Sequence, residues 1–339
     1  GDFTLPQGLQ QWYLEVPTKR RLVGLISFLL QELAKVPKAL VFFSSSDSVD
    51  FHFDLLSAAC WPGMERTKKE KPSGPRFGTR GEIKMSDSES EEEEDEEDDT
   101  GRIFAGTQIF KLHGNLTADQ RAGFIKEFRN ARKAVMLATD VAARGLDIPT
   151  VGWIVQYDPP TAVEEYLQRV GRTARLGKAG NACLFLLPSE TEYLEKLRVF
   201  GVELGTLDFE QIVQRALVEN EDAPDLLRKV KEAPAFLNGQ LAHFVEANDG
   251  LLKLARQAYL ASTRAYQTFP RELKSIFNVK ALHTGHFASS FALKEPPKKV
   301  QQVVQYGEDH RKISSKWKKM PGMRLKEMSQ KSGKGKGDG

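Results

Sequence analysis

The chain has 339 residues, of which 40% are hydrophobic and 28% are charged, and its formal net charge is +3. This size and composition allow one to three domains with a globular core. No run of about eighteen apolar residues occurs, so no membrane is expected. Two isolated cysteines, Cys60 and Cys183, argue against a zinc site and a disulfide scaffold.

Short apolar runs alternate with helical patterns over the first two thirds of the chain, which is typical of a parallel sheet covered by helices on both faces. We therefore predict an α/β fold. The predicted strands lie at 11–16, 39–43, 108–112, 134–138, 152–157 and 182–187. The predicted helices lie at 20–33, 46–59, 118–129 and 162–170.

Two of these helices begin with a capping-box pattern, Thr117-x-x-Gln120 and Thr161-x-x-Glu164. In such a box the hydroxyl and the side chain three residues later each bond to the other residue's backbone amide. Both patterns predict a helix that begins immediately after the threonine.

Residues 61–106 interrupt this alternation with Pro, Gly and basic residues, followed by an acidic run at 86–100 that holds eleven acids and no base. We predict a disordered insertion, which the sheet tolerates because the cost of closing a loop grows slowly with its length. Without the acidic run the chain is strongly basic, which favours an anionic partner such as nucleic acid. The run itself is either a solvated tract or an inhibitor that competes for the same surface.

Helical spacing dominates from about residue 209 to residue 281, as in Leu251, Leu254, Ala255 and Ala258. We predict a helical extension that packs on the sheet domain. The tail from Lys294 holds thirteen Lys/Arg against five acids and is expected to be disordered. It either holds RNA electrostatically or is simply solvated.

Three arginines stand at intervals of three in residues 168–175, whose sequence is Gln-Arg-Val-Gly-Arg-Thr-Ala-Arg. Guanidinium groups stay charged and donate in pairs to phosphate oxygens, so this spacing favours a polyphosphate ligand over surface ion pairing. No phosphate loop and no acidic metal-binding motif occur in the sequence. We therefore expect the nucleotide to be held mainly by another part of the protein.

Residues 138–147 (Ala-Thr-Asp-Val-Ala-Ala-Arg-Gly-Leu-Asp) and 168–175 resemble motifs V and VI of the DEAD-box ATP-dependent RNA helicases. Leu40–Ser46 and Leu112-His113-Gly114 resemble motif IV and the strand end that follows it. Residues 251–299 are similar to the C-terminal extension of a nucleolar subset that acts in ribosome biogenesis. The Val-Phe-Phe-Ser-Ser and Trp-Ile-Val-Gln-Tyr strands are shared with helicases of large-subunit assembly.

The resemblance implies a second RecA-like domain at 1–205, a helical extension at 206–293 and a basic tail at 294–339. It assigns Arg172 and Arg175 as catalytic arginine fingers that reach the γ-phosphate of ATP, and Gly145 and Asp147 as neighbours of the nucleotide, with Asp147 accepting from the ribose. ATP with Mg²⁺ is then held mainly by a first RecA-like domain, and this chain itself offers no metal ligands.

The same resemblance places RNA-backbone contacts at Gly114, Asn115, Arg121 and Thr139. It assigns Gln168 and Arg169 to coupling between the domains, with Arg169 in internal pairing or cleft closure. Gln168 departs from the family's usual histidine, so we expect altered coupling between RNA and ATP but no loss of hydrolysis.

The implied function is that of the C-terminal half of an ATP-dependent RNA helicase acting on ribosomal RNA in the nucleus and nucleolus. Expected partners are pre-ribosomal RNA, proteins of the pre-ribosomal particle and the first RecA-like domain. Because the chain begins with Gly1 and lacks the phosphate loop, we expect a fragment that is inactive alone. The alternative is a non-enzymatic module for RNA binding or protein docking with relic helicase motifs.

Overall fold

The computed structural model describes residues 8–64, 101–174, 179–294 and 297–306. It divides into a unit that ends at Lys294 and a second unit that begins at Glu295 and contains α12 (Pro297–Tyr306). The acidic run, Arg175 and most of the basic tail lie outside the described residues. The helix α12 falls within the segment that was expected to be disordered.

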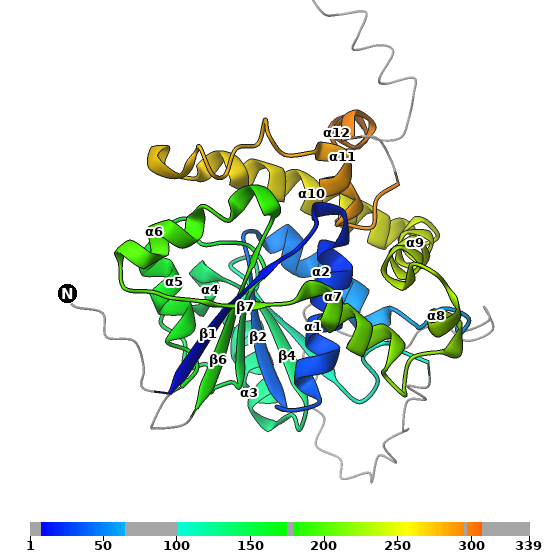
Figure 1. Cartoon of the computed structure of the whole chain (residues 1–339), viewed down its shortest axis with the longest axis horizontal. Helices are drawn as coiled ribbons and strands as arrows, with labels where there is room; N and C mark the ends of the chain where they lie inside the picture. The colour runs from blue at the N-terminus through cyan, green and yellow to red at the C-terminus, as the bar shows by residue number, and fades with distance from the viewer. Residues whose placement is uncertain (1–7, 65–100, 175–178, 295–296, 307–339) are drawn as a thin grey trace, which may run out of the picture. The chain divides into compact units, whose positions relative to one another are not determined.

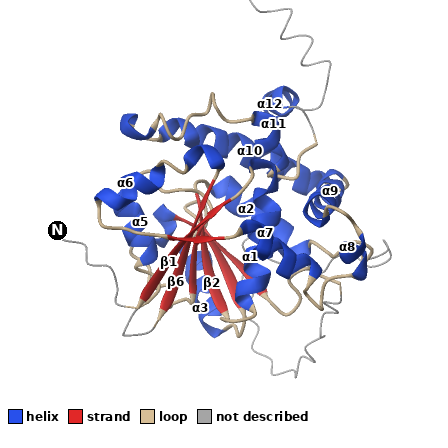
Figure 2. Cartoon of the chain, in the orientation of Figure 1, coloured by secondary structure: helices blue, strands red, loops and turns tan. Residues whose placement is uncertain are grey.

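A seven-stranded sheet forms the centre of the first unit, in the order β3-β4-β2-β5-β6-β1-β7 (Figures 1 and 2). Every pair of neighbouring strands is parallel, which confirms the predicted α/β class. The strands are β1 (Leu9–Glu15), β2 (Lys38–Phe43), β3 (Gln108–Leu112), β4 (Ala134–Thr139), β5 (Trp153–Gln156), β6 (Gly180–Leu186) and β7 (Gly205–Leu207).

Helices connect the strands and then form the extension after β7. The longer ones are α1 (Arg21–Leu33), α2 (Ser46–Ala58), α3 (Ala118–Asn130), α5 (Val163–Val170), α6 (Tyr193–Val199), α9 (Ala233–Glu246) and α10 (Asp249–Thr268). The shorter ones are η1 (Thr18–Arg20), α4 (Asp140–Ala143), η2 (Pro188–Glu190), α7 (Phe209–Val213), the π-helical η3 (Gln214–Val218), α8 (Asp225–Lys229), η4 (Arg271–Leu273) and α11 (Thr284–Ser289).

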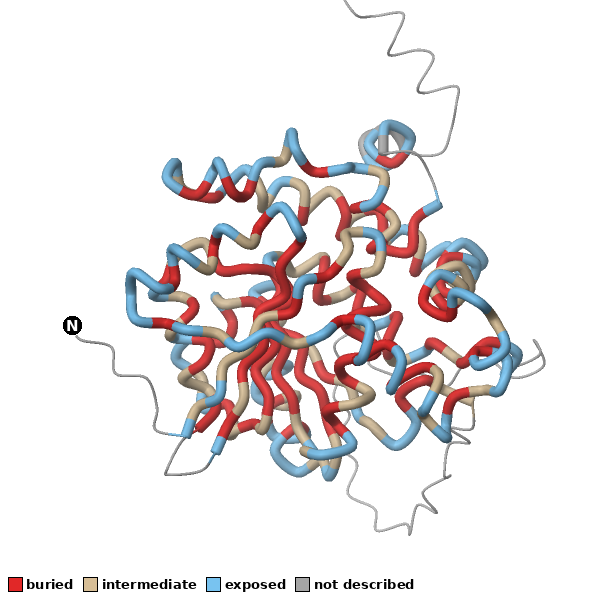
Figure 3. The backbone as a smooth tube through the Cα atoms, viewed as in Figure 1, coloured by how far each residue is buried: buried red, intermediate tan, exposed pale blue. Residues whose placement is uncertain are grey.

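The central strands are buried on both faces, as expected for a parallel sheet with helices on either side (Figure 3). On one face, Phe42 and Met136 belong to a core that includes Phe128 of α3 and Tyr166 of α5. The neighbouring residues along each strand point to the opposite face, because successive side chains in a strand alternate.

Helices α1 and α2 cover this opposite face. The ring of Phe28 in α1 meets Trp153 of β5 edge-on, with a centroid separation of 5.0 Å. Phe43 of β2 lies 4.6 Å from the ring of His52 in α2. Helix α10, yellow in Figure 1, packs along α2, where the Ser48 and Ser262 hydroxyls lie 2.8 Å apart. The extension therefore packs against the helix layer of the sheet domain.

One of the two predicted capping boxes is confirmed and the other is wrong. The Thr117 hydroxyl accepts from the Gln120 amide, and the Gln120 side chain accepts from the Thr117 amide. Helix α5 instead has Ala162 as its N-cap, with no side-chain cap. Thr161 lies one residue further out, so its amide and hydroxyl donate to Glu165, one position later than the predicted Glu164.

The two ends of the predicted insertion are part of the fold. The Trp61 amide donates to the Gly101 carbonyl, and Cys60 and Arg102 form an antiparallel bridge. Trp61, Ile103 and Phe104 are buried. Residues 61–64 and 101–106 were expected to be disordered because they lack periodicity, whereas aromatic and aliphatic burial orders them.

The strand β7 was not predicted, and it crosses the expected domain boundary after residue 205. Three residues are too few to show an alternating pattern. Gly205 pairs with Trp12 in the register of β1 and β7, and a Cβ at this glycine would lie 2.6 Å from the Trp12 ring. Because Gly205 has no side chain, the Trp12 ring packs directly against its backbone, and this contact fixes the position of the edge strand β7.

We predict that Thr117→Ala lowers the free energy of unfolding by about 1 kcal/mol, because the Gln120 amide at the start of α3 loses its acceptor. Thr117→Ser keeps the hydroxyl and is the matched control. Urea denaturation of the 339-residue chain measures both. Equal losses for Ala and Ser would contradict the role of the hydroxyl as a cap.

Candidate functional site

Three loops that follow neighbouring strands meet at the carboxyl edge of the sheet. Ser44 follows β2, Thr139 ends β4 and Asp158 follows β5, and the register pairs Phe43 with Thr139 and Phe42 with Gln156. Open parallel sheets bind ligands just outside this edge. The motif V segment (138–147) therefore lies where a ligand site is expected.

Arg169 is buried at this edge and holds motif V. Its Nε and Nη2 donate to the two carboxylate oxygens of Asp140 at 2.7 and 2.6 Å. Its Nη1 donates to the main-chain carbonyl of Asp158 at 2.7 Å and to Gln156 at 3.3 Å. Only 3% of Arg169 is exposed, so it is a structural clasp between motifs V and VI.

The Asp158 carboxylate is the second centre of this polar cluster. It accepts from the Nη2 of Arg21 at 2.7 Å and from the amide and hydroxyl of Ser44 at 2.9 and 2.8 Å. Burial disfavours the charged form, but the attraction of Arg21 and the hydrogen bonds from Arg21 and Ser44 outweigh it and lower the pKa of Asp158. The carboxylate is therefore ionised and fully engaged.

An open depression lies beside this clasp and is lined by Arg144, Gly145, Glu164, Glu165, Gln168 and Arg172. Gly145 has a φ of 71°, a left-handed conformation that glycine adopts without strain. Nη1 of Arg172 donates to the carbonyl of Leu146 at 3.2 Å. Three of the residues expected at a nucleotide or in coupling are thus brought together: Gly145, Gln168 and Arg172.

Asp147 follows directly and is highly exposed, with 90% of its side chain accessible. Its carboxylate accepts from Arg129 of α3 at 3.1 Å. A surface pair of this kind is weak and can be exchanged for a ligand hydroxyl. Arg175, the other expected arginine finger, lies outside the described residues.

Tight packing holds the backbone on which Arg172 stands. The hydroxyl of Thr173 donates to the Val151 carbonyl at 2.5 Å, and Ala174 has a left-handed φ of 51°. A Cβ at Gly180 would lie 2.2 Å from the Thr173 hydroxyl oxygen and 2.4 Å from the Ala174 amide nitrogen. Glycine at the start of β6 is thus required for motif VI to approach the sheet.

The expected RNA-binding residues lie on the same edge, mostly away from the depression. Gly114 and Asn115 are exposed after β3, Arg121 is half-buried in the first turns of α3, and Thr139 is buried at the end of β4. None of these four lines the depression formed by the described residues of motifs V and VI. They therefore lie outside the depression, after β3, in α3 and at the end of β4.

Sequence reasoning missed two residues that hold the site. Arg21 is the last of three consecutive basic residues and begins the apolar helix α1, and Asp158 follows a buried strand. A charged residue in an otherwise apolar helical face, and a carboxylate directly after a strand, were the available signals. Their pairing could not be read from the sequence, because 137 positions separate them along the chain.

Arg144, Arg172, Glu164 and Glu165 border the depression, and Nη2 of Arg144 donates to Glu165 at 2.9 Å. Arg172 adds a second guanidinium, whose donors suit an anion. Over residues 8–64, 101–174, 179–294 and 297–306, no cluster of three or more His, Cys, Asp or Glu side chains is arranged to hold a metal ion. The described helices include none that is long and apolar enough to cross a membrane.

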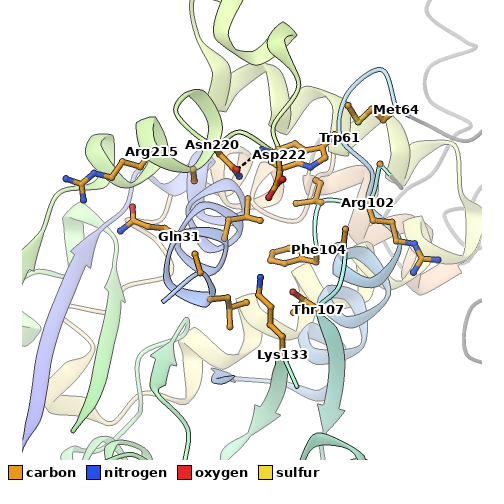
Figure 4. A pocket seen from close by; sticks show the side chains of 17 residues that line it. Gln31, Trp61, Met64, Arg102, Phe104, Thr107, Lys133, Arg215, Asn220 and Asp222 are labelled. Carbon is orange, nitrogen blue, oxygen red and sulfur yellow. Dashed lines mark hydrogen bonds between the residues drawn. The ribbon is translucent and has the colours of Figure 1, made fainter. Parts of the chain in front are cut away.

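A second cavity, of about 670 Å³, lies away from these loops, between the end of α1, the two ordered arms of the insertion and the η3 region (Figure 4). Trp61 and Phe104 form part of its wall, and Lys133 and Asp222 also line it. None of the residues expected to bind nucleotide or RNA lines this cavity. The candidate site is therefore the open depression and the adjoining edge.

Two family profiles match parts of the chain. A profile described as the helicase conserved C-terminal domain matches residues 86–177. A profile described as the C-terminal extension of "ATP-dependent rRNA helicase SPB4-like" proteins matches residues 248–299. The first includes the whole of motif V and motif VI, and the second includes α10 and α11.

Curated relatives cover most of this chain. The probable ATP-dependent RNA helicase CG8611 of Drosophila melanogaster is 38% identical over 304 residues, and DEAD-box ATP-dependent RNA helicase 17 of Oryza sativa subsp. japonica is 36% identical over 339 residues. ATP-dependent RNA helicase DBP7 of Meyerozyma guilliermondii is 35% identical over 353 residues.

These alignments cover 88%, 95% and 93% of this chain but 29%, 52% and 47% of the relatives. The chain thus spans about a third to a half of their length. Among solved structures, domain 2 of the Mss116p DEAD-box helicase bound to an RNA duplex is 17% identical and has a TM-score of 0.46, covering 88% of this chain and 94% of that chain.

We predict that Asp158→Asn lowers the free energy of unfolding by about 3–5 kcal/mol, because Arg21 is left buried without a countercharge. Asp147→Asn, at the exposed pair with Arg129, should leave stability unchanged. Because the pKa of Asp158 is depressed in the fold, its stabilisation is present above the pKa of an ordinary carboxyl, about 3.9. It is lost as pH falls through the folded pKa.

Denaturation of the three proteins between pH 7 and pH 3 measures both effects. The difference between the natural chain and Asp158→Asn should shrink in acid. A difference that stays constant down to pH 3 or grows in acid would contradict the ionised pair.

Proposed function

Because this chain belongs to the DEAD-box RNA helicase family, as its conserved C-terminal domain followed by an SPB4-like extension, we propose that it is the C-terminal half of an ATP-dependent RNA helicase. In this proposal it supplies arginines and a carboxylate to a nucleotide held mainly by a first RecA-like domain. It also supplies half of the groove for RNA.

The observation that carries the proposal is the position of Arg172. Its guanidinium is hydrogen-bonded to the Leu146 carbonyl beside Asp147 and borders an open depression at the carboxyl edge of the sheet. Motif VI therefore places a cation against the backbone of motif V, one residue before the exposed carboxylate of Asp147. This arrangement suits a nucleotide, with phosphate oxygens toward Arg172 and a ribose hydroxyl toward Asp147.

ATP with Mg²⁺, when bound between two such domains, supplies the phosphoryl group that is transferred to water. Arg172 neutralises negative charge on the phosphate oxygens, and we assign the same role to Arg175. Gly145 lets the backbone approach the ligand closely. Arg169 reaches no ligand, because its donors are engaged by Asp140 and Asp158, and it keeps the two motifs in register. Gln168 lines the depression and can accept or donate there, but it cannot titrate.

For RNA, we propose contacts at Gly114, Asn115, Arg121 and Thr139, along the edge above β3 and β4. Gly114 and Asn115 offer backbone amides at an exposed turn, and Arg121 offers a cation. Contacts of these types recognise sugar and phosphate and are blind to base sequence.

We propose ribosomal RNA as the substrate, with action in large-subunit biogenesis in the nucleus and nucleolus. The SPB4-like extension at 248–299 supports this substrate, since that profile is described for rRNA helicases. Proteins of the pre-ribosomal particle and the first RecA-like domain are the proposed partners. A non-enzymatic docking module is the alternative, and the anchoring of Arg172 to motif V at the border of an open depression argues against it, because a pure binder has no use for an arginine finger.

We predict that the 339-residue chain alone does not turn over ATP, and that the protein joined to its phosphate-loop domain does so with RNA. In that longer protein Arg172→Ala should lower kcat by about 10³-fold or more, because charge on the transferring group is no longer neutralised. Arg198→Ala, at an exposed pair on α6, is the matched control and should retain turnover. RNA-stimulated turnover that survives Arg172→Ala would refute the proposed role of this arginine.

A binding experiment on the chain itself tests the RNA groove. Arg121→Ala should weaken binding to single-stranded RNA about equally for unrelated sequences, and should reduce the slope of log affinity against log salt by about 1. Arg198→Ala again serves as the control. A change that depends on RNA sequence would contradict a backbone contact.

A further inference from the structure

The C-terminal extension reaches the buried polar cluster through an aromatic ring. The guanidinium of Arg21 lies 4.2 Å from the centroid of the Tyr157 ring and 5.7 Å from that of Phe287 in α11. Phe287 is 1% exposed and Arg21 is 4% exposed. The extension therefore covers a charge that belongs to the sheet domain.

From Arg21 a continuous series of contacts leads to motif V. Arg21 donates to the carboxylate of Asp158, the carbonyl of Asp158 accepts from Arg169, and Arg169 clasps the carboxylate of Asp140. Arg21, Asp158 and Arg169 are each at most 8% exposed. Away from water such pairs are strong and tightly oriented.

A second contact fixes the same part of the extension. The hydroxyl of Tyr266 in α10 donates to the buried carboxylate of Glu190, which also accepts from the Leu187 amide at 2.8 Å. Burial raises the pKa of Glu190 despite these two bonds. The Tyr266 ring lies 5.7 Å from that of Phe287, so α10 supports the ring that covers Arg21.

We propose that the C-terminal extension is a positioning element for motifs V and VI, and that Arg21 and Asp158 are the positioning residues that connect it to Arg169. Phe287 keeps water from the Arg21–Asp158 pair. Without the ring, water weakens the pair and Asp158 loses its fixed orientation. The carbonyl of Asp158 then holds Arg169 less firmly, and the segment that carries Arg172 loosens.

The order of these loops can be measured without any enzymatic activity. In the 339-residue chain, Phe287→Leu removes the aromatic face and keeps an apolar side chain. We expect amide hydrogen exchange in residues 140–147 and 169–174 to become about fivefold faster, within the range of coupling between connected networks.

The matched control is Phe277→Leu. Phe277 is also 1% exposed and belongs to the extension, but the rings that it contacts are those of Phe269 at 4.0 Å, Tyr193 at 5.2 Å and Tyr266 at 6.3 Å. This change costs a comparable amount of packing without touching Arg21. If Phe287→Leu and Phe277→Leu changed the hydrogen-exchange rates of residues 140–147 and 169–174 equally, the proposal would be overturned.

Arg21→Lys provides a second variant, because it keeps the positive charge but lacks the planar guanidinium that lies over the Tyr157 ring and whose Nη2 donates to both the Tyr157 carbonyl and the Asp158 carboxylate. It should loosen the same two loops, and unchanged exchange there would also overturn the proposal. The effect on catalysis rests on the proposed function. In the protein joined to its phosphate-loop domain, both variants should lower kcat about fivefold and leave the KM for ATP nearly unchanged.

The hydrogen-exchange experiment and the turnover experiment distinguish failure of the positioning role from failure of the helicase proposal. Loosened loops in a protein with no RNA-stimulated turnover would refute the helicase proposal and leave the positioning role standing. RNA-stimulated turnover together with unchanged hydrogen exchange of the two loops in both variants would refute the positioning role and leave the helicase proposal standing.

Discussion

The buried guanidinium of Arg169 is the constraint on which the candidate site depends. Two of its donors grip Asp140, the first residue of α4, and a third holds the carbonyl of Asp158 after β5. A buried arginine is tolerated only when its donors are satisfied and its charge is balanced. Burial of Arg169 therefore requires that motifs V and VI lie against each other.

The polar residues at this edge of the sheet therefore fall into two groups, those that hold the loops in place and those that face a ligand. Arg21, Asp158 and Arg169 are buried and engaged with one another, so they hold loops in place. Gly145 and Asp147 are exposed in the loop after α4, and Gln168 is exposed on α5, so a ligand can reach all three. A preorganised site needs both groups, since a donor helps a reaction only when its position is already fixed.

The extension belongs to this arrangement as much as the sheet does. Its helix α10 packs along α2, and Phe287 closes the cluster around Arg21. The ordered arms of the insertion, by contrast, pack at a different place, through Trp61 and Phe104. The described arms of the insertion, residues 61–64 and 101–106, therefore do not line the motif V and VI depression.

The sequence by itself determined the parallel sheet, most of its strands, the cap of α3 and the segments that meet at the carboxyl edge. These features depend on periodicity, local hydrogen bonds and strand polarity, which neighbouring residues decide. The second capping box was wrong because Thr161 and Glu165 lie one residue out of the predicted register. The strand β7 and the ordered ends of the insertion depend on packing against Trp12 and the core, which no local pattern encodes.

Only the tertiary structure decided which polar residues hold the site and which face the ligand. Arg21 meets Asp158, and Arg169 meets Asp140, across long stretches of chain. Such pairs form because burying a charge is costly unless an opposite charge is brought to it. That cost depends on the surroundings of each side chain in the folded chain. The sequence shows three evenly spaced arginines, and only their surroundings decide which of them pairs internally and which is available to a ligand.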